Sequence, residues 1–574
     1  MKKLLVYLRE YRKESILGPL FKLLEAGFEL IVPLVVAAII DRGIGTQDRG
    51  NIVAMSLVLV GLGLVGPLCS VTAQYFAAKA SVGFVKNLRH ALYSHIQGFS
   101  YQMLDRVGIS TLITRMTSDM NQVQTGLNLA LRLLLRSPFV VFGAMIMAFT
   151  IDARAALWFV AAIPALSVVV FGIMLASIPL YRKVQGLLDK VLGATRENLT
   201  GARVLRAFSK EDTEIAAFEE KNEALTSMQK YVGRISALMN PVTYVIINLA
   251  IIFLIHTGAI RVEAGIITQG AVVALYNYMN QILVELIKLA NLIINITKSL
   301  ACAKRIQNVL GMPAGEPVKQ DLPKGDSKYR VQFIHTGIRY SEGADASLTD
   351  VNLSVLPGET VGVIGGTGSG KSTFVNLIPR FYEATEGQVM VDGMDVRAME
   401  PEALRARIGI VPQKAVLFQG TIRENLQWGN KNATDEEIMQ AVLIAQAEDV
   451  VVSKGGLDAM IEQTGRNLSG GQRQRLTIAR ALVRKPDILI LDDSSSALDF
   501  ATDATLRKAL REMDCRPTVF IVSQRTSSIQ HADQIVVLDD GRAVGVGTHL
   551  DLLETCPVYR EIYDSQFKKE AAGA

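Results

Sequence analysis

The first half of the chain alternates long apolar runs with hydrophilic connections. Each run is close to or longer than the roughly 20 residues that cross a bilayer as a helix. The runs occupy about 16–40, 52–80, 130–150, 155–180, 240–260 and 268–298. The pattern therefore predicts six transmembrane helices and a lipid bilayer as the surroundings of this part of the protein.

The connections between these runs differ in length and charge. Short hydrophilic segments lie near 41–51, 151–154 and 261–266, whereas two long ones cover 84–128 and 181–238. The long connections should extend the helices and end in short crosswise helices. Because basic residues stay on the cytoplasmic side, we expect a multi-pass protein of the cell membrane whose long connections and both termini are cytoplasmic. The basic residues concerned are Lys86, Arg89, Arg106, Arg115, Arg182, Lys183 and Lys210.

The segment 1–13 is amphipathic, with its leucines near one helical face and its basic residues toward the others. This pattern predicts a helix that lies at the membrane interface. A secretory signal peptide is the alternative. Lys22, Glu25 and Glu29 interrupt the apolar run that follows, and no small-residue cleavage site is evident, which favours the interfacial helix.

The character of the sequence changes after about residue 305. Proline, glycine and charged residues dominate the next stretch, as in a linker. From Tyr329 onward, short β-rich runs alternate with helical stretches, which predicts an α/β domain with a largely parallel sheet. We therefore divide the chain into a membrane domain over 1–308, a linker over 309–328 and a second domain over 329–574.

Composition supports this division. The 574 residues exceed the size of one ordinary core, and 49% hydrophobic residues with a mean hydropathy of +0.27 are too apolar for a wholly soluble protein. The net charge of +5 is compatible with nucleic-acid binding, but basic membrane loops account for it, so we expect no nucleic-acid partner. The scattered cysteines lack the spacing of metal sites or disulfide frameworks, and we expect structural thiols: Cys69, Cys302, Cys515 and Cys556.

A phosphate-binding motif follows the strand-like segment Thr360–Ile364. Glycines in such a loop let backbone N–H groups surround an anion at the start of a helix. Lys371 is placed to reach the β- and γ-phosphates, and the hydroxyl of Ser372 can ligate Mg²⁺. A glycine-rich turn without a ligand is the alternative. The motif consists of Gly365, Gly366, Thr367, Gly368, Ser369, Gly370, Lys371 and Ser372.

Two further motifs narrow the class of nucleotide-binding protein. An apolar strand over 488–492 ends in Asp492, a carboxylate suited to Mg²⁺. A second motif stands just before a helix and reads Leu468, Ser469, Gly470, Gly471 and Gln472. With this LSGGQ between the two nucleotide motifs, the chain resembles the ABC transporter family over its whole length. Six helices followed by one such cassette resemble an exporter-type half-transporter, with a polytopic α-helical membrane domain before an α/β P-loop ATPase domain.

The resemblance implies ATP and Mg²⁺ as ligands and assigns several further residues. Tyr340 resembles the aromatic residue that stacks on adenine, although a strand tyrosine is the alternative, and Thr373 falls in the nucleotide site. Gln413 resembles the glutamine that contacts Mg²⁺ and the attacking water. Asp499 lies in a segment that resembles the loop that passes between paired sites. The segments 104–112 and 201–211 resemble the helices that couple the membrane domain to the cassette near the Gln413 loop, the alternative being ordinary solvated loops.

Three positions depart from the family pattern. The catalytic glutamate is replaced by Asp493, whose shorter side chain retracts the carboxylate by about 1 Å. The switch histidine is replaced by Gln524, an amide that can hydrogen-bond a γ-phosphate but cannot be protonated as imidazole can. Gln463 stands near a position where relatives often carry glutamate. The candidate catalytic residues are Gln413, Asp493 and Gln524. The changes at Asp493 and Gln524 predict that this site hydrolyses ATP slowly.

The resemblance implies that two cassettes share two nucleotides, so this chain needs a second half. Its LSGGQ would complete the competent site of a heterodimeric partner, and the cargo would be an amphiphilic small molecule of multidrug or lipid-like character. The alternatives are neutral variation at the two positions, a nucleotide-gated sensor without transport, and a homodimeric lipid flippase. Charged residues in the spans either line a path for the cargo or pair locally, as Glu285 with Lys288 and Lys22 with Glu25.

Overall fold

The computed structural model describes residues 3–315, 318, 322, 326–340, 343, 345–513 and 515–571. The chain forms two compact units. The first comprises Met1–Gln97 and Ser110–Met312, and the second comprises Gly98–Ile109 and Pro313–Ala574. The predicted linker over 309–328 lies partly outside the described residues.

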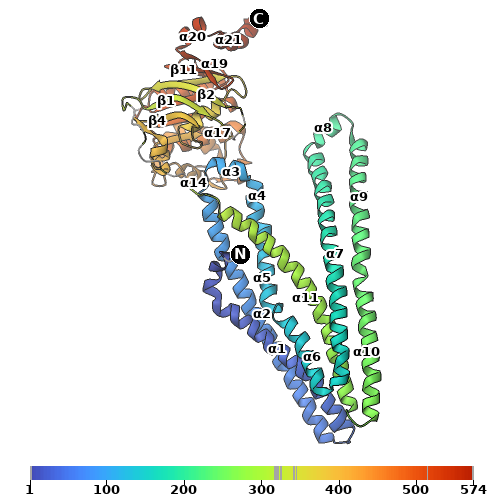
Figure 1. The fold of residues 1–574 in the computed structure, drawn as a ribbon. Helices are drawn as coiled ribbons and strands as arrows, with labels where there is room; N and C mark the ends of the chain where they lie inside the picture. Colours follow the sequence, from blue (N-terminus) through green and yellow to red (C-terminus); the bar gives the residue numbers. More distant parts are fainter. Residues whose placement is uncertain are drawn as a thin grey trace. The chain divides into compact units, whose positions relative to one another are not determined.

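The first unit is helical (Figure 1). Among the residues that the structure describes, six helical segments are long and apolar enough to cross a membrane, which confirms the predicted number. They are Leu4–Ile44, Arg49–Gln97, Ile109–Ile151, Ala153–Thr200, Glu211–Glu263 and Gln269–Leu310. The segments extend well beyond the apolar runs, because the polar connections continue the helices rather than forming loops.

These segments are built from shorter elements. A 3₁₀ turn over Leu4–Tyr11 leads into α1, so the amphipathic N-terminal segment is helical, while its place at a membrane interface stays a prediction. Two π-helical turns, Ile39–Ile44 and Arg115–Asp119, interrupt the regular pattern. The α-helices are α1 (Arg12–Ala38), α2 (Arg49–Gln97), α4 (Ile109–Thr114), α5 (Met120–Leu133), α6 (Arg136–Ile151), α7 (Ala153–Thr200), α8 (Ala202–Ala207), α9 (Glu211–Ala237), α10 (Met239–Glu263) and α11 (Gln269–Leu310).

Charged side chains of the spans pair with one another inside the first unit. Arg136 is buried and lies 2.5 Å from a carboxylate oxygen of both Glu285 and Glu29. Lys288 lies 2.9 Å from Glu285, and Lys22 lies 2.5 Å from Glu25, so both predicted local pairs form. A buried charge without a partner is costly, and this pairing explains how these side chains are tolerated between apolar helices.

The second unit contains a six-stranded, largely parallel sheet in the order β12-β11-β3-β10-β9-β6, as the sequence predicts. Only β12 runs antiparallel to its neighbour, β11. All five residues of β9 and of β10 are buried, as expected of strands covered on both faces. The strands are β3 (Thr360–Gly365), β6 (Ile408–Val411), β9 (Ile488–Asp492), β10 (Thr518–Val522), β11 (Gln534–Asp539) and β12 (Arg542–Gly547).

A separate antiparallel sheet has the order β2-β1-β4-β5, and the sequence analysis does not predict it. Phe333 of this sheet stacks on Phe374 of α12 with 4.2 Å between ring centroids, which fixes the helix after the phosphate loop against the sheet. The strands are β1 (Val331–Ile338), β2 (Leu348–Val355), β4 (Glu386–Val391) and β5 (Met394–Asp395), and a short pair joins β7 (Gly420–Thr421) to β8 (Met460–Ile461).

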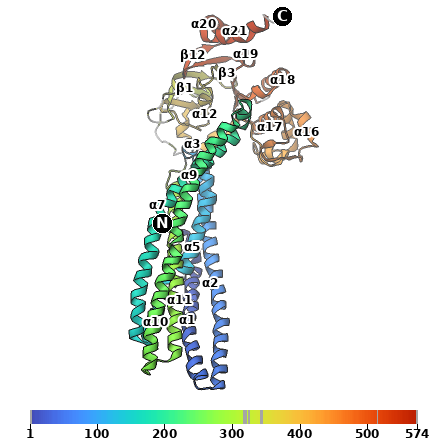
Figure 2. The same cartoon turned by 90° about the vertical axis from the view of Figure 1, so that its right-hand side faces the viewer.

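The helices of the second unit begin at recognisable caps. Four of them, α14, α15, α17 and α20, start with a reciprocal capping box, in which the N-cap side chain and the third helical residue each bind the other's backbone N–H. The helices are α3 (Tyr101–Val107), α12 (Lys371–Leu377), α13 (Pro401–Ala406), α14 (Ile422–Gln427), α15 (Asp435–Ile444), α16 (Glu448–Lys454), α17 (Gly470–Val483), α18 (Phe500–Arg511), α19 (Thr526–Ile529), α20 (His549–Thr555) and α21 (Pro557–Ala571). Figure 2 shows α12 and α17 at separate places in this unit.

Candidate functional site

A cavity of about 270 Å³ lies where β3, β9 and β10 end. The carboxyl ends of parallel strands are the usual place for a ligand in an open α/β sheet. The cavity brings together most of the predicted phosphate loop, the predicted Mg²⁺ ligands and both altered catalytic positions. The residues that line it are Ser347, Thr367, Gly368, Gly370, Lys371, Ser372, Thr373, Gln413, Asp492, Asp493, Val522 and Gln524.

Two glycines of the loop are required by close packing. A Cβ at Gly365 would lie 2.0 Å from the carbonyl oxygen of Leu538, and a Cβ at Gly370 would lie 2.7 Å from that of Ser347. Gly370 also has a φ of 95°, in the left-handed region that favours glycine. The loop can therefore curl tightly at the start of α12 only with these residues, and its backbone N–H groups are the natural donors to a phosphate.

Lys371 lies within this loop and folds back on it. Its Nζ donates to the carbonyl oxygens of Gly365 at 2.9 Å and Gly366 at 2.6 Å. Burial lowers the pKa of Lys371, and the nearby carboxylates of Asp493 and Asp492 partly oppose that shift. The ammonium group is thus held where a phosphate oxygen can replace the loop carbonyls as its partner.

The predicted Mg²⁺ ligands meet beside the loop. Ser372 Oγ donates to Oδ1 of Asp492 at 3.0 Å. Burial raises the pKa of Asp492, and the neighbouring Asp493 adds to the shift. Hydroxyl and carboxylate oxygens in direct contact are the donors that a hard cation prefers, so this pair fits Mg²⁺ as the sequence predicts.

The candidate catalytic residues Asp493 and Gln413 are also in contact. Gln413 Nε2 donates to Oδ2 of Asp493 at 3.3 Å, and the backbone N–H of Asp493 donates to the carbonyl of Val522 at 3.0 Å. Asp493 has a φ of 46° and a ψ of 33°, which is left-handed. The left-handed backbone of Asp493 therefore sets the direction of its carboxylate, directly after the strand that ends in Asp492.

Gln524 reaches the cavity from the segment after β10. Its backbone carbonyl accepts a hydrogen bond of 2.8 Å from Nε2 of Gln566 in α21. Oε1 of Gln566 accepts from the backbone N–H and the hydroxyl of Thr526, both at 2.9 Å. Sequence reasoning misses Gln566, because an isolated glutamine in a C-terminal helix has no motif and its contacts are about 40 residues away.

Tyr340 lies next to the phosphate cavity rather than among the residues that line it. Its hydroxyl is 3.0 Å from the Oγ1 of Thr373, and its ring meets Tyr382 edge to face with centroids 5.0 Å apart. Tyr340 is 39% exposed, so part of its surface is accessible to a ligand. An aromatic face beside a phosphate loop is suited to stacking on a base.

The first predicted coupling segment is divided between the two units: its part up to Ile109 belongs to the same unit as this site, and residues 110–112 belong to the first unit. Helix α3 stacks Tyr101 on Phe381 with 4.1 Å between ring centroids, and Asp105 accepts a hydrogen bond of 2.6 Å from the hydroxyl of Tyr382. Tyr101 lies slightly before the predicted range of 104–112. Its partner Phe381 and the partner of Asp105, Tyr382, lie in the segment after α12. The second predicted segment, over 201–211, contains α8 and belongs to the first unit.

The LSGGQ residues are placed away from the cavity. Ser469 caps α17, and its Oγ accepts from the N–H of Gln472 at 3.2 Å, while Gln472 Oε1 accepts from the N–H of Ser469 at 2.9 Å. A Cβ at Gly471 would lie 3.0 Å from the carbonyl of Ala497. Leu468 is buried, Ser469 and Gly470 are exposed, and none of the five is among the cavity-lining residues.

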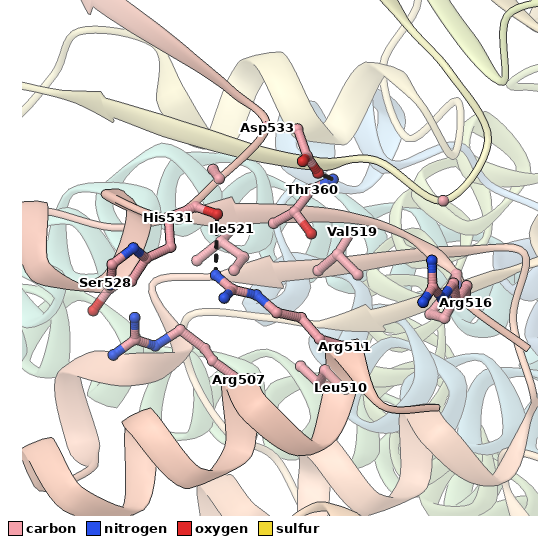
Figure 3. A pocket seen from close by; sticks show the side chains of 13 residues that line it. Thr360, Arg507, Leu510, Arg511, Arg516, Val519, Ile521, Ser528, His531 and Asp533 are labelled. Atoms are coloured by element: carbon pink, nitrogen blue, oxygen red, sulfur yellow. Dashed lines mark hydrogen bonds between the residues drawn. The ribbon is translucent and has the colours of Figure 1, made fainter. Parts of the chain in front are cut away.

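A second cavity of about 340 Å³ lies at the opposite, amino-terminal ends of β3 and β10 (Figure 3). Arg511 spans part of it and donates from Nη2 to the carbonyl of His531 at 3.0 Å, and Asp533 accepts from the N–H of Thr360 at 2.7 Å. It contains none of the predicted site residues. The phosphate loop, Asp492 and the candidate catalytic residues therefore meet at the carboxyl ends of the strands and not in this second cavity.

Comparisons with known proteins agree with this geometry. The family model described as the ABC transporter transmembrane region matches residues 15–286, and the model described as ABC transporter matches residues 348–496. An ABC transporter ATP-binding protein of Mycobacterium tuberculosis is 37% identical over 573 residues, covering 99% of this chain and 98% of the relative. An ATP-dependent lipid A-core flippase of Pectobacterium atrosepticum is 30% identical, covering 94% and 93%.

The fold is also similar to that of a solved structure, a bacterial Atm1-family ABC exporter with ATP bound. The TM-score is 0.81 at 23% identity, and the match covers 97% of this chain and 98% of the other. Both halves of the architecture therefore occur together in known proteins. This chain belongs to the ABC transporter family and unites an exporter-type transmembrane region with an ATPase domain in one polypeptide.

Proposed function

We propose that this transport ATPase is one half of a heterodimeric exporter of amphiphilic compounds, and that its own ATP site hydrolyses slowly. The observation that carries the proposal is the composition of one cavity, where Lys371, Ser372 and Asp492 keep their expected identities beside the altered Asp493 and Gln524. The residues assigned to nucleotide binding keep their expected identities, whereas two of the three residues assigned to hydrolysis, Asp493 and Gln524, do not.

The two changes act on different parts of the chemistry. A general base must approach the attacking water within hydrogen-bond distance, and Asp493 has one methylene less reach than glutamate. Gln524 can donate a hydrogen bond to a γ-phosphate but cannot carry positive charge as a protonated histidine can. Mg²⁺, held by Ser372 and Asp492, would neutralise phosphate charge. We therefore assign ATP binding to the residues around Lys371 and slow hydrolysis to Asp493, Gln413 and Gln524.

A complete site requires a second chain. Ser469 and Gly470 are exposed and absent from the lining of the phosphate cavity, so the LSGGQ of this chain is available to another nucleotide. In the heterodimer it completes the partner's competent site, while the partner's own signature closes over Lys371 and Tyr340. Binding of ATP between the two cassettes then favours one state of the membrane helices by its differential affinity for that state.

The cargo class is inferred from a relative and from the apolar spans, and the orientation is inferred from the charge of the connections. The flippase relative acts on a lipid-like molecule by its name, and six apolar spans provide a bilayer-facing surface, which favours an amphiphilic cargo. The basic residues of the long connections favour a cytoplasmic ATPase domain in the cell membrane. The connections continue as helices in the structure and end near α3 and α8, the proposed couplers.

The test compares the chain alone with the chain and a cognate half, both in proteoliposomes. ATP hydrolysis and ATP-dependent flux of a fluorescent lipid analogue are measured. We expect tight ATP binding but slow hydrolysis by the chain alone, and brisk hydrolysis with flux only in the complex. Brisk hydrolysis by the chain alone would contradict the heterodimer, and ATP binding without flux in either sample would favour a sensor over an exporter.

A further inference from the structure

We propose that Gln566 is a positioning residue of the ATP site, which holds the switch segment Ser523–Thr526 so that Gln524 can discriminate ATP from ADP. The inference rests on the proposed nucleotide-binding role of the cavity and adds a residue from the far end of the chain. Its basis is a set of hydrogen bonds between α21 and the backbone of this segment.

Both ends of the Gln566 amide bind the switch segment. Nε2 donates to the carbonyl of Gln524 at 2.8 Å, and Oε1 accepts from the N–H and the hydroxyl of Thr526 at 2.9 Å each. Two of these bonds hold the backbone on either side of Arg525, and the third holds the hydroxyl of Thr526. Since the side chain of Gln524 lines the phosphate cavity, a fixed backbone here determines where its amide points.

The remaining contacts hold the segment at its start and its middle. The N–H of Ser523 donates to the carbonyl of Val363 at 3.1 Å, and Ser523 Oγ accepts from the N–H of Arg525 at 2.9 Å. The guanidinium carbon of Arg525 lies 4.7 Å from the ring centroid of Phe500. Ser523 and Thr526 are 1% and 0% exposed. The hydrogen bond that holds the carbonyl of Gln524 itself comes from Gln566.

The contacts of Tyr559 hold helix α21 in place, so that this helix can support the switch segment. Tyr559 is 0% exposed and its hydroxyl lies 2.7 Å from Nδ1 of His549 in α20. Gln566 follows Tyr559 by seven residues, two helical turns, and therefore lies on the same face of α21. Burial of Tyr559 thus sets the face of the helix that meets the switch segment.

The chemical consequence concerns the γ-phosphate. Of the two nucleotides, only ATP carries the phosphate that the Gln524 amide is proposed to bind, whereas the β-phosphate that the loop and Lys371 also reach is common to ATP and ADP. Loss of the Gln566 bonds lets Gln524 move and removes a contact specific to ATP. A purely structural role for α21 would weaken both nucleotides together.

The experiment measures binding of a non-hydrolysable ATP analogue and of ADP to the full chain in lipid nanodiscs, by displacement of a fluorescent nucleotide with Mg²⁺. Gln566→Ala should weaken the ATP analogue about 5-fold, as expected for one or two lost hydrogen bonds, with ADP changed less than about 2-fold. Gln566→Glu keeps the acceptor for Thr526 but cannot donate to Gln524, and it should match Gln566→Ala. The matched control is Gln530→Ala, at a half-buried glutamine outside the cavity lining, which should change neither affinity.

The same measurement in a Gln524→Ala protein tests whether Gln566 acts through Gln524. If Gln566 acts through Gln524, then Gln566→Ala should have no further effect in a Gln524→Ala protein. Equal losses for both nucleotides, no loss for either, or an undiminished effect without Gln524 would each overturn the proposal. The readout is binding rather than turnover, so it stands even if the chain hydrolyses ATP briskly and the proposed slow site is wrong.

Discussion

Gln413 Nε2 lies 3.3 Å from Oδ2 of Asp493, so two candidate catalytic side chains hydrogen-bond to each other. Both residues line the phosphate cavity, so the Asp493 carboxylate is held there beside a second candidate catalytic side chain. An attacking water would have to share or replace this bond. The impairment that we propose is therefore one of distance and charge within an otherwise assembled site.

Restoring reach and charge should accelerate hydrolysis at this site. We expect Asp493→Glu combined with Gln524→His to raise turnover by on the order of 10- to 100-fold, because displacement of a catalytic group by about 1 Å can cost that much. Turnover is measured in the assembled complex with the partner's own site inactivated. An unchanged rate would mean that the slow step lies elsewhere.

The ammonium group of Lys371 should be essential for nucleotide binding. Lys371→Ala removes the cation at the centre of the phosphate loop, and we expect ATP affinity to fall by about 100-fold, as for loss of a charge-assisted contact. Fluorescent-nucleotide titration of the full chain checks this. Lys485→Ala is the control, since it removes only a partly exposed pair with Glu437 at 2.6 Å and should leave affinity unchanged.

The hydrogen bond between Tyr382 and Asp105 should couple hydrolysis to transport. Tyr382→Phe removes only the hydroxyl that donates at 2.6 Å and leaves the ring against Tyr340. We expect flux per ATP hydrolysed to fall about 2- to 10-fold, as for loss of one hydrogen bond, while ATP affinity is kept. Asp105→Asn can still accept the hydrogen bond and should therefore lower the flux per ATP hydrolysed less than Tyr382→Phe does. Parallel losses of flux and hydrolysis would refute a role in coupling.

The pH dependence of stability should carry a contribution from His549. Burial lowers its pKa from the ordinary value, with His531 adding to the shift. A lowered pKa favours the neutral ring in the folded state, so its stabilising contribution is full above the unfolded pKa of about 6.5 and is lost as pH falls through the folded pKa. Thermal unfolding of the full chain should lose less stability between about pH 7.5 and pH 5 in His549→Gln than in the wild type. An identical loss in both proteins would exclude this contribution.

Local patterns account for the parts of the molecule that the sequence predicts. Six spans follow from apolar length, and the order of strand, glycine-rich loop and helix around Lys371 follows from spacing along the chain. The same holds for Asp492 at the end of an apolar strand. In each case the interacting groups lie within one element or its immediate neighbour, where periodicity and turn chemistry are informative.

Contacts between distant segments escape this reasoning. The antiparallel sheet of β1, β2 and β4 depends on pairing across loops. The hydrogen bond from Gln566 to Gln524 joins α21 to the segment after β10, about 40 residues earlier in the chain. The docking of Tyr101 and Asp105 on the cassette is equally remote in sequence from Phe381 and Tyr382. Such partners are selected by the tertiary fold and leave no periodic signal.

The left-handed backbone of Asp493 has a consequence for the slow site that we propose. Aspartate enters this conformation far more readily than most residues that carry a Cβ, so aspartate in place of glutamate relaxes the backbone at this position. A return to glutamate restores the longer side chain but also restores the strain of that side chain on a left-handed backbone. In the heterodimer that we propose, loss of activity at this position is then easier than its recovery, and folding as well as function would hold the chain to a competent partner.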